Sequence, residues 1–254
     1  MKTTTLIIIL SSFALFASAQ NNKIIKGKVA NLESKEKEKL DKIFSKYVAV
    51  NVDDSPLDEI HKFKNKEVSF SIPNVDLPIK SLTFINSEII KDKVIPKNFN
   101  AKISLLKAIN LPEGDVFALS IIDKSISGVY YPKSGEEWIF APIHHILGKD
   151  FLSSNTVVFY KKSYFKDKSK QSCATSSALK QLRSANVMSN SNNYCRKLYV
   201  AIEGDEEWFN FHGFFGGYGA MFGIMNNVSN IYSSQLNREF AFKDLIFSHD
   251  NYHQ

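Results

Sequence analysis

The sequence predicts an α+β protein, in which an antiparallel, β-rich domain is followed by an incomplete strand–helix–strand (βαβ) unit. Short runs of β-branched and aromatic residues recur through residues 67–162, and a polar segment then precedes a strand, a helix and a second strand. We therefore expect a signal peptide over residues 1–19, a β-rich domain over 20–165, a linker over 166–194 and the βαβ unit over 195–254.

The first residues, MKTTTLIIILSSFALFASAQ, have the form of a signal peptide. Lys2 supplies the positive start, and the apolar run over residues 6–16 is shorter than the roughly 20 residues that a membrane-spanning helix needs. The small residues of Ala-Ser-Ala then predict cleavage between Ala19 and Gln20. We expect a secreted, extracellular chain with no membrane span once the signal is removed.

Composition narrows the class of protein. The 254 residues carry a formal net charge of +6, and the lysines are scattered rather than gathered in a stripe, so we do not expect nucleic-acid binding. A hydrophobic fraction of 44% and 20 phenylalanines predict packed cores and argue against disorder.

The β-rich region begins after one amphipathic helix, which we predict over residues 32–47 from apolar residues at three- and four-residue steps. Seven short runs then alternate or concentrate apolar side chains and are separated by Asn, Gly, Pro, Asp and Lys. These predicted strands are 67–72, 79–85, 101–109, 116–122, 126–132, 137–143 and 156–162. Their even spacing favours an antiparallel meander folded on itself.

After the polar linker, a near-continuous apolar run at 197–203 predicts a strand that is covered on both faces. Residues 218–236 carry an apolar helical stripe, and 240–247 form the next strand. This order predicts a right-handed crossover with parallel strands. A lone crossover leaves one face of its sheet uncovered, so the unit is expected to be incomplete.

The segment CRKLYVAIEGDEEWFNFHG, with MNNVSNIY farther along the helix, resembles the start of the catalytic domain of adamalysin/reprolysin-type (metzincin) zinc metalloendopeptidases. Residues 114–163 are similar to the propeptide of the same family. The resemblance implies a zymogen propeptide followed by the first βαβ unit of a secreted peptidase. It also implies protein substrates for the full-length form.

The zinc motif of that family, His-Glu-x-x-His-x-x-Gly-x-x-His, places two histidines on one helix face and a glutamate as general base. None of the six histidines here is followed by glutamate, and the nearest imitation, His249 to His253, has Asp250 in that place. We therefore predict no catalytic residue and no metal ligand in this chain, and no bound cofactor. Zinc is expected only in a full-length relative, and the chain is predicted to be inactive without the remainder of the protease domain as its partner.

Three other histidines are candidates of lower interest. His144 and His145 end a predicted strand, where adjacent side chains point to opposite faces and do not chelate one ion. His212 lies at the entrance of a glycine-rich turn, which it could orient or pack against. The glycines that follow lack the spacing of a phosphate-binding loop, so we expect them to serve a tight turn and close helix packing.

The two cysteines, Cys173 and Cys195, leave three alternatives open. An even count in an exported protein favours a disulfide between them. The resemblance implies a second role for Cys173, as a propeptide thiolate that silences the zinc of a zymogen. Free thiols are the third alternative.

Three functions follow from these observations. The first is the N-terminal portion of a secreted reprolysin-like zinc metalloendopeptidase, truncated before its zinc motif. The second is a complete secreted, non-enzymatic binding or inhibitory module derived from such a propeptide. The third is an extracellular β-domain unrelated to proteases. The apolar face of the crossover discriminates the first two, because a fragment leaves this face exposed and a finished module covers it.

Overall fold

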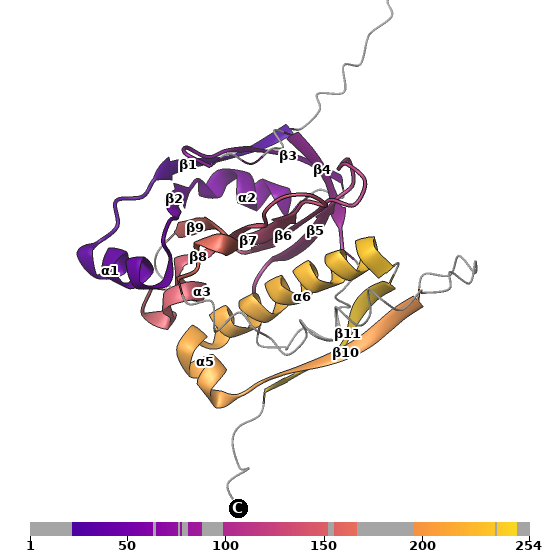
Figure 1. Cartoon of the computed structure of the whole chain (residues 1–254). Coiled ribbons are helices and arrows are strands. Elements are labelled where there is room, and N and C mark those ends of the chain that lie inside the picture. The colour runs from indigo at the N-terminus through magenta and orange to yellow at the C-terminus, as the bar shows by residue number, and fades with distance from the viewer. Residues whose placement is uncertain are drawn as a thin grey trace, which may run out of the picture.

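The computed structural model describes residues 22–62, 65–75, 77, 81–87, 99–151, 155–166, 196–236 and 238–247. Nine strands form a closed barrel in the order β1-β2-β9-β8-β7-β6-β5-β4-β3 (Figure 1). They are β1 (Asn22–Val29), β2 (Val48–Val52), β3 (Asn65–Ser71), β4 (Ser81–Asn86), β5 (Ile103–Ala108), β6 (Val116–Ile122), β7 (Ser125–Tyr131), β8 (Trp138–Pro142) and β9 (Thr156–Lys161).

The strands β3 to β9 form the expected meander, since each pairs antiparallel with the next along the chain. The strand β1 closes the ring. Its residues Asn22–Lys26 pair in parallel with β3, and Gly27–Val29 then pair antiparallel with β2, which in turn pairs with β9. The predicted antiparallel propeptide-like domain is therefore wrong, because the fold is a closed, mixed barrel.

Sequence patterns missed β1 and β2 for physical reasons. The run NKIIKGKV has three lysines in eight residues and only a weak apolar alternation, so it lacks the usual strand signal. The predicted helix over 32–47 is shorter than expected. Helix α1 (Ser34–Ile43) ends where Phe44 forms a β-bridge with Phe165 on the outside of the barrel.

The helix α2 (Asp54–Ile60) fills one end of the barrel (Figure 1). Its Leu57 and Ile60 are fully buried in the barrel core. Aromatic rings fill the rest of the interior. Phe117 and Phe140 lie 6.0 Å apart edge to face, and Phe140 stacks on Phe159 at 5.0 Å. The barrel is thus a packed core and not an empty channel.

Two short helical segments, α3 (Ile143–Leu147) and η2 (Lys149–Phe151), connect β8 to β9, and η3 (Lys162–Tyr164) follows β9. A second apolar cluster joins α1 and α3 to the outer face of the barrel. It includes the buried residues Leu40, Phe44, Ile143 and Tyr160.

The C-terminal elements are β10 (Arg196–Gly204), α5 (Glu206–His212), α6 (Phe214–Leu236) and β11 (Arg238–Phe247). The strands β10 and β11 pair in parallel as a two-stranded sheet. Helix α6 lies between this sheet and the barrel strands β5 to β7 (Figure 1). It is long enough to cross a membrane, but neither it nor any other helix in the described ranges is also sufficiently apolar.

The apolar side of α6 is covered by the barrel. Phe222 is fully buried. It belongs to one apolar cluster with Leu105 of β5 and with Phe99, which lies just before β5 in the chain. Asn226, also fully buried, donates from its amide nitrogen to the carbonyls of Leu106 and Leu119 at 3.3 and 3.0 Å. The predicted incomplete, metzincin-like βαβ unit is therefore wrong as well, because the helix shares its core with the barrel.

One glycine explains how close the helix comes. A Cβ at position 223 would lie 3.0 Å from the hydroxyl of Ser127 on β7, so a side chain there would push the helix off the barrel wall. The sequence prediction of close helix packing at these glycines holds at this position, although the partner is the barrel and not the sheet of the crossover.

Candidate functional site

Several residues predicted from the sequence lie outside the described ranges. These are Ala19 and Gln20 at the predicted signal cleavage, Cys173 and Cys195, and His249 and His253. The disulfide, the cysteine switch and the signal cleavage remain predictions, and so does the linker over 166–194, of which only Lys166 is described.

The other three predicted histidines come together. His144 and His145 lie in the helix α3, not at a strand end as expected, and their rings contact each other at 4.6 Å between centroids. The ring of His212, at the end of α5, lies 6.0 Å from that of His145 and 4.2 Å from that of Trp208. We call these three residues the histidine cluster. It joins the C-terminal elements to the barrel.

In the histidine cluster His144 and His212 are buried and His145 is half-buried, and all three rings are neutral. Burial, with a smaller contribution from the neighbouring imidazoles, lowers the pKa of His144 to about 4 and that of His145 to about 3. Burial also lowers the pKa of His212. The Nδ1 atoms of His144 and His212 are buried without a hydrogen-bond partner. The cluster is therefore a packed group of neutral rings that resists protonation.

Unpartnered imidazole nitrogens raise the question of a metal. In the part of the chain that the structure describes, no group of three or more His, Cys, Asp or Glu side chains is arranged to hold a metal ion. The three rings meet edge to face at 86° and 90°, which suits ring packing. We assign the cluster to the interface between α3 and α5.

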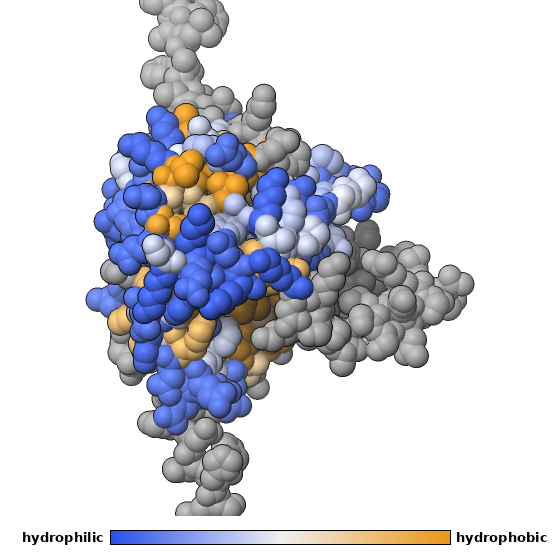
Figure 2. Space-filling model, turned by 60° about the vertical axis from the view of Figure 1, so that its left-hand side comes forward, coloured by the Kyte–Doolittle hydropathy of each residue, from blue (hydrophilic) through white to orange (hydrophobic). Residues whose placement is uncertain are grey.

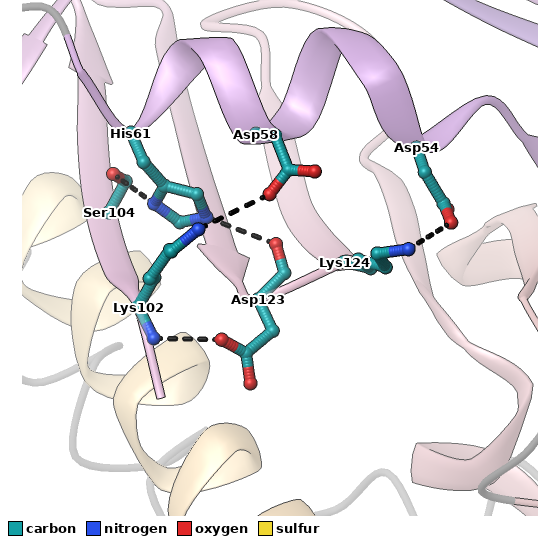
Figure 3. Close-up of polar contacts among 7 residues, drawn as sticks. All are labelled: Asp54, Asp58, His61, Lys102, Ser104, Asp123 and Lys124. Atoms are coloured by element: carbon teal, nitrogen blue, oxygen red, sulfur yellow. Dashed lines mark hydrogen bonds and ion pairs between the residues drawn. The ribbon is translucent and has the colours of Figure 1, made fainter. Parts of the chain in front are cut away.

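A second polar group was not predicted from the sequence. His61, just after α2, contacts the hydroxyl of Ser104 through Nδ1 at 2.8 Å and the carbonyl of Asp123 through Nε2 at 3.0 Å (Figure 3). Because a carbonyl only accepts, Nε2 carries the proton, and in the neutral ring Ser104 donates to Nδ1. A hydroxyl that donates to an oriented imidazole is the arrangement of an activated nucleophile.

The surroundings of Ser104 decide against that chemistry. Its side chain is buried on strand β5 under α2, and neither Ser104 nor His61 lines any cavity described below. Two ion pairs also hold α2 near this contact. Lys102 pairs with Asp58 at 3.5 Å, and Lys124 pairs with Asp54 at 2.8 Å (Figure 3). The group fastens α2 into its end of the barrel.

The opposite end of the barrel holds the largest described cavity, of about 490 Å³. It opens where β1 leaves β3 after the pair Lys26–Ser71 and turns to β2. Described residues that follow β3 also line it, namely Ile72, Pro73, Val75 and Leu77. Apolar side chains that pack on the barrel core form the floor, and they are Phe70, Ile72, Val75 and Leu77. Lys26, Lys28 and Asp53 form an exposed rim.

A smaller cavity, of about 170 Å³, lies on the other side of the same segment, since Asn74 lines it while Pro73 and Val75 line the first. Its remaining lining is aromatic and basic and consists of Lys46, Tyr47, Val48, Trp138, Phe159, Lys161 and Tyr164. The ammonium of Lys161 lies 5.2 Å from the centre of the Trp138 ring. We call the two cavities and their linings the barrel mouth.

The barrel mouth carries more positive than negative charge. The described lining contains four lysines and one carboxylate, that of Asp53. One of the lysines, Lys161, pairs with Glu136 at 3.2 Å. None of the ion pairs between described residues involves Lys26, Lys28 or Lys46. Tyr47 stays neutral, because burial and its hydrogen bond to Asp41 raise its pKa to about 12.

Sequence reasoning missed the barrel mouth because its lining comes from five strands, three connecting segments and the short helix η3. The alternation Lys26-Gly27-Lys28 was visible, but scattered lysines usually serve solvation. A third cavity, of about 260 Å³, lies between β10 and α6 and is lined by Ile202, Glu203, Gly204, Asp205, Trp208, Met221 and Ile224. The face that Figure 2 shows is largely hydrophilic and carries separate apolar areas among the charged side chains.

Comparison with known proteins adds no family. No family model matches the sequence, and no curated protein is significantly similar to it. The resemblance to reprolysin-type peptidases therefore rests on the sequence segments alone.

Proposed function

We propose that this chain is an exported, non-enzymatic binding module that takes a small ligand at the barrel mouth. The observation that carries the proposal is the cavity of about 490 Å³ with an apolar floor and a polar rim. Ligand pockets of proteins have a volume in this range and combine an apolar lining with a few polar groups. The mouths of β-barrels are among the places where such pockets occur. The rest of the barrel interior is filled by side chains, so the ligand is held at the end and not in the centre.

The packing of α6 supports a binding module over a protease fragment. The helix side of the crossover is buried, since Phe222, Met221 and Met225 lie between the barrel and the two-stranded sheet, while Tyr199 on the other face of β10 is exposed. Two polar groups that resemble catalytic arrangements have structural contacts instead. The pair His61 and Ser104 fastens a helix, and the histidine cluster joins two elements.

The test is a thermal-shift screen of the purified chain against a chemically varied set of small molecules. Binding at the barrel mouth raises the melting temperature, because a ligand that binds only the folded state stabilises it by mass action. The variant Val75→Trp fills the floor of the cavity, and we expect it to abolish the shifts. A matched variant, Ile224→Trp, enlarges a half-exposed residue of the third cavity and should leave them unchanged.

The competing function, the N-terminal portion of a zinc metalloendopeptidase, is measured on the same protein. One equivalent of tightly bound zinc together with hydrolysis of casein would overturn the proposal and support a peptidase. Ligands whose shifts survive in Val75→Trp but not in Ile224→Trp would place binding at the third cavity and also overturn it.

A further inference from the structure

Resting on the proposed function, we infer that the ligand of the barrel mouth is a small amphiphilic carboxylate. Its anionic head lies on the ammonium groups of Lys26 and Lys28, and its apolar body lies on the floor formed by Phe70, Ile72, Val75 and Leu77. Both halves of the inference come from the lining of the larger cavity.

The floor selects an apolar body. Its four side chains are half-buried and pack against the barrel core, so the apolar surface that remains open faces the cavity. Removing such a surface from water is favourable in proportion to its area. These four side chains offer no hydrogen bonds and Ser71 is the one hydroxyl in the described lining, so a polar body would recover little of its lost hydration.

The rim selects an anionic head. Lys26 and Lys28 are two residues apart on the same strand, so their side chains lie on one face of β1. Neither takes part in an ion pair between described residues. Among the described lining residues the other titratable group is Asp53, so they carry two positive charges against one negative. A carboxylate gains two charge-assisted contacts here, and a cation meets a net repulsion.

The second cavity extends the same preference. In the second cavity, Lys46 takes part in no ion pair between described residues. The rings of Tyr47, Trp138 and Tyr164 add apolar surface to its lining. The basic and aromatic groups therefore continue along the mouth, and a body longer than the first cavity has a place to extend.

The experiment compares three ligands that share one apolar chain. Octanoate, octanol and octylammonium are titrated into the full chain by isothermal calorimetry at low salt. We expect octanoate to bind tightest and octylammonium weakest. The double variant Lys26→Gln/Lys28→Gln should weaken octanoate about ten-fold and change octanol less than about two-fold, because only the charged contacts are lost.

A matched control removes two lysines elsewhere. Lys35→Gln/Lys37→Gln changes the net charge equally on the exposed face of α1 and should leave octanoate binding unchanged. Equal binding of octanoate and octanol, or an equal loss in both double variants, overturns the carboxylate assignment. If other molecules still shift the melting temperature and lose that effect in Val75→Trp, the proposed function stands while this inference fails. If no ligand responds to Val75→Trp, both fail.

Discussion

The two ends of the barrel differ in how their polar groups are used. At the end filled by α2, His61, Lys102 and Lys124 each contact a partner on another element, and Leu57 and Ile60 complete the core. At the barrel mouth, Lys26 and Lys28 have no ion pair between described residues and border a cavity of about 490 Å³. Charges that are satisfied inside the protein stabilise it, and charges beside an open apolar floor are available to a ligand.

A contact that resembles a catalytic motif does not by itself mark a functional site. The contact between Ser104 and His61 has the geometry of an activated hydroxyl, yet Ser104 is buried and neither residue lines any of the three described cavities. The mouth has no recognisable motif but has the space. The predictions below separate the two ends by their effects on stability, in order of expected size.

The largest effect is expected for Leu57→Ala in α2. This side chain is fully buried, so its truncation leaves a cavity and should lower the free energy of unfolding by about 2 to 5 kcal/mol. Urea denaturation followed by circular dichroism measures it. Val75→Ala at the half-buried mouth should cost about 1 kcal/mol or less. Equal losses at the two positions would contradict the distinction between a plugged and an open end.

The second effect is acid destabilisation through the histidine cluster. An unfolded chain protonates its imidazoles below a pKa of 6.5, while the folded chain keeps His144 neutral down to about pH 4 and His145 down to about pH 3. The free energy of unfolding therefore falls as the pH drops from 6.5 towards 4, by roughly 3 kcal/mol for His144 alone.

The variant His145→Gln tests this cause. It removes one group that takes up a proton only on unfolding. Between pH 6 and 4, the slope of the unfolding free energy against pH should therefore fall by the equivalent of about one proton. His61→Gln at the α2 end serves as the comparison. An unchanged slope in His145→Gln would show that the cluster is not what makes the protein acid-sensitive.

A smaller effect is expected for Ser104→Ala. The loss of a partly buried hydrogen bond to His61 should lower the free energy of unfolding by about 1 to 2 kcal/mol. A double-mutant cycle with His61→Gln isolates the coupling between the two side chains. A coupling energy near zero would mean that the pair does not fasten α2 as the geometry indicates.

The smallest effects on the free energy of unfolding are expected for the exposed lysines, and here the two ends of the barrel should not differ. Lys124→Gln breaks a surface ion pair with Asp54, and Lys26→Gln/Lys28→Gln breaks none between described residues, so both should unfold close to the wild-type chain. Only the loss in Lys124→Gln should disappear at high salt. A marked destabilisation by the mouth variant would mean that its lysines are structural.

Parts of the fold were accessible from the sequence. The strands at residues 67–162 follow from alternation and turn residues, and α6 follows from its apolar stripe, because both signals depend on neighbours within a few residues. The closed barrel was not accessible. Nothing in NKIIKGKV indicates that its first half pairs with β3 and its second half with β2. Strand partners are chosen by the whole sheet, and a local pattern does not name them.

The candidate site was less accessible still. Lys26, Phe70 and Val75 are far from Trp138 and Lys161 in sequence, and only closure of the barrel places them around one opening. The histidines at 144, 145 and 212 were noticed individually, but a strand end was the wrong context for the first two, and their contact with the third depends on the docking of α5.

By itself the sequence determined that this is a β-rich chain with packed aromatic cores, and that its six histidines lack the glutamate of the peptidase zinc motif. The tertiary structure decided that the sheet closes, that α6 covers the barrel wall and that a cavity opens at one end beside Lys26 and Lys28. The physical reason is one of range. Periodicity records which face of an element avoids water, whereas closure and cavities depend on how all the faces fit together.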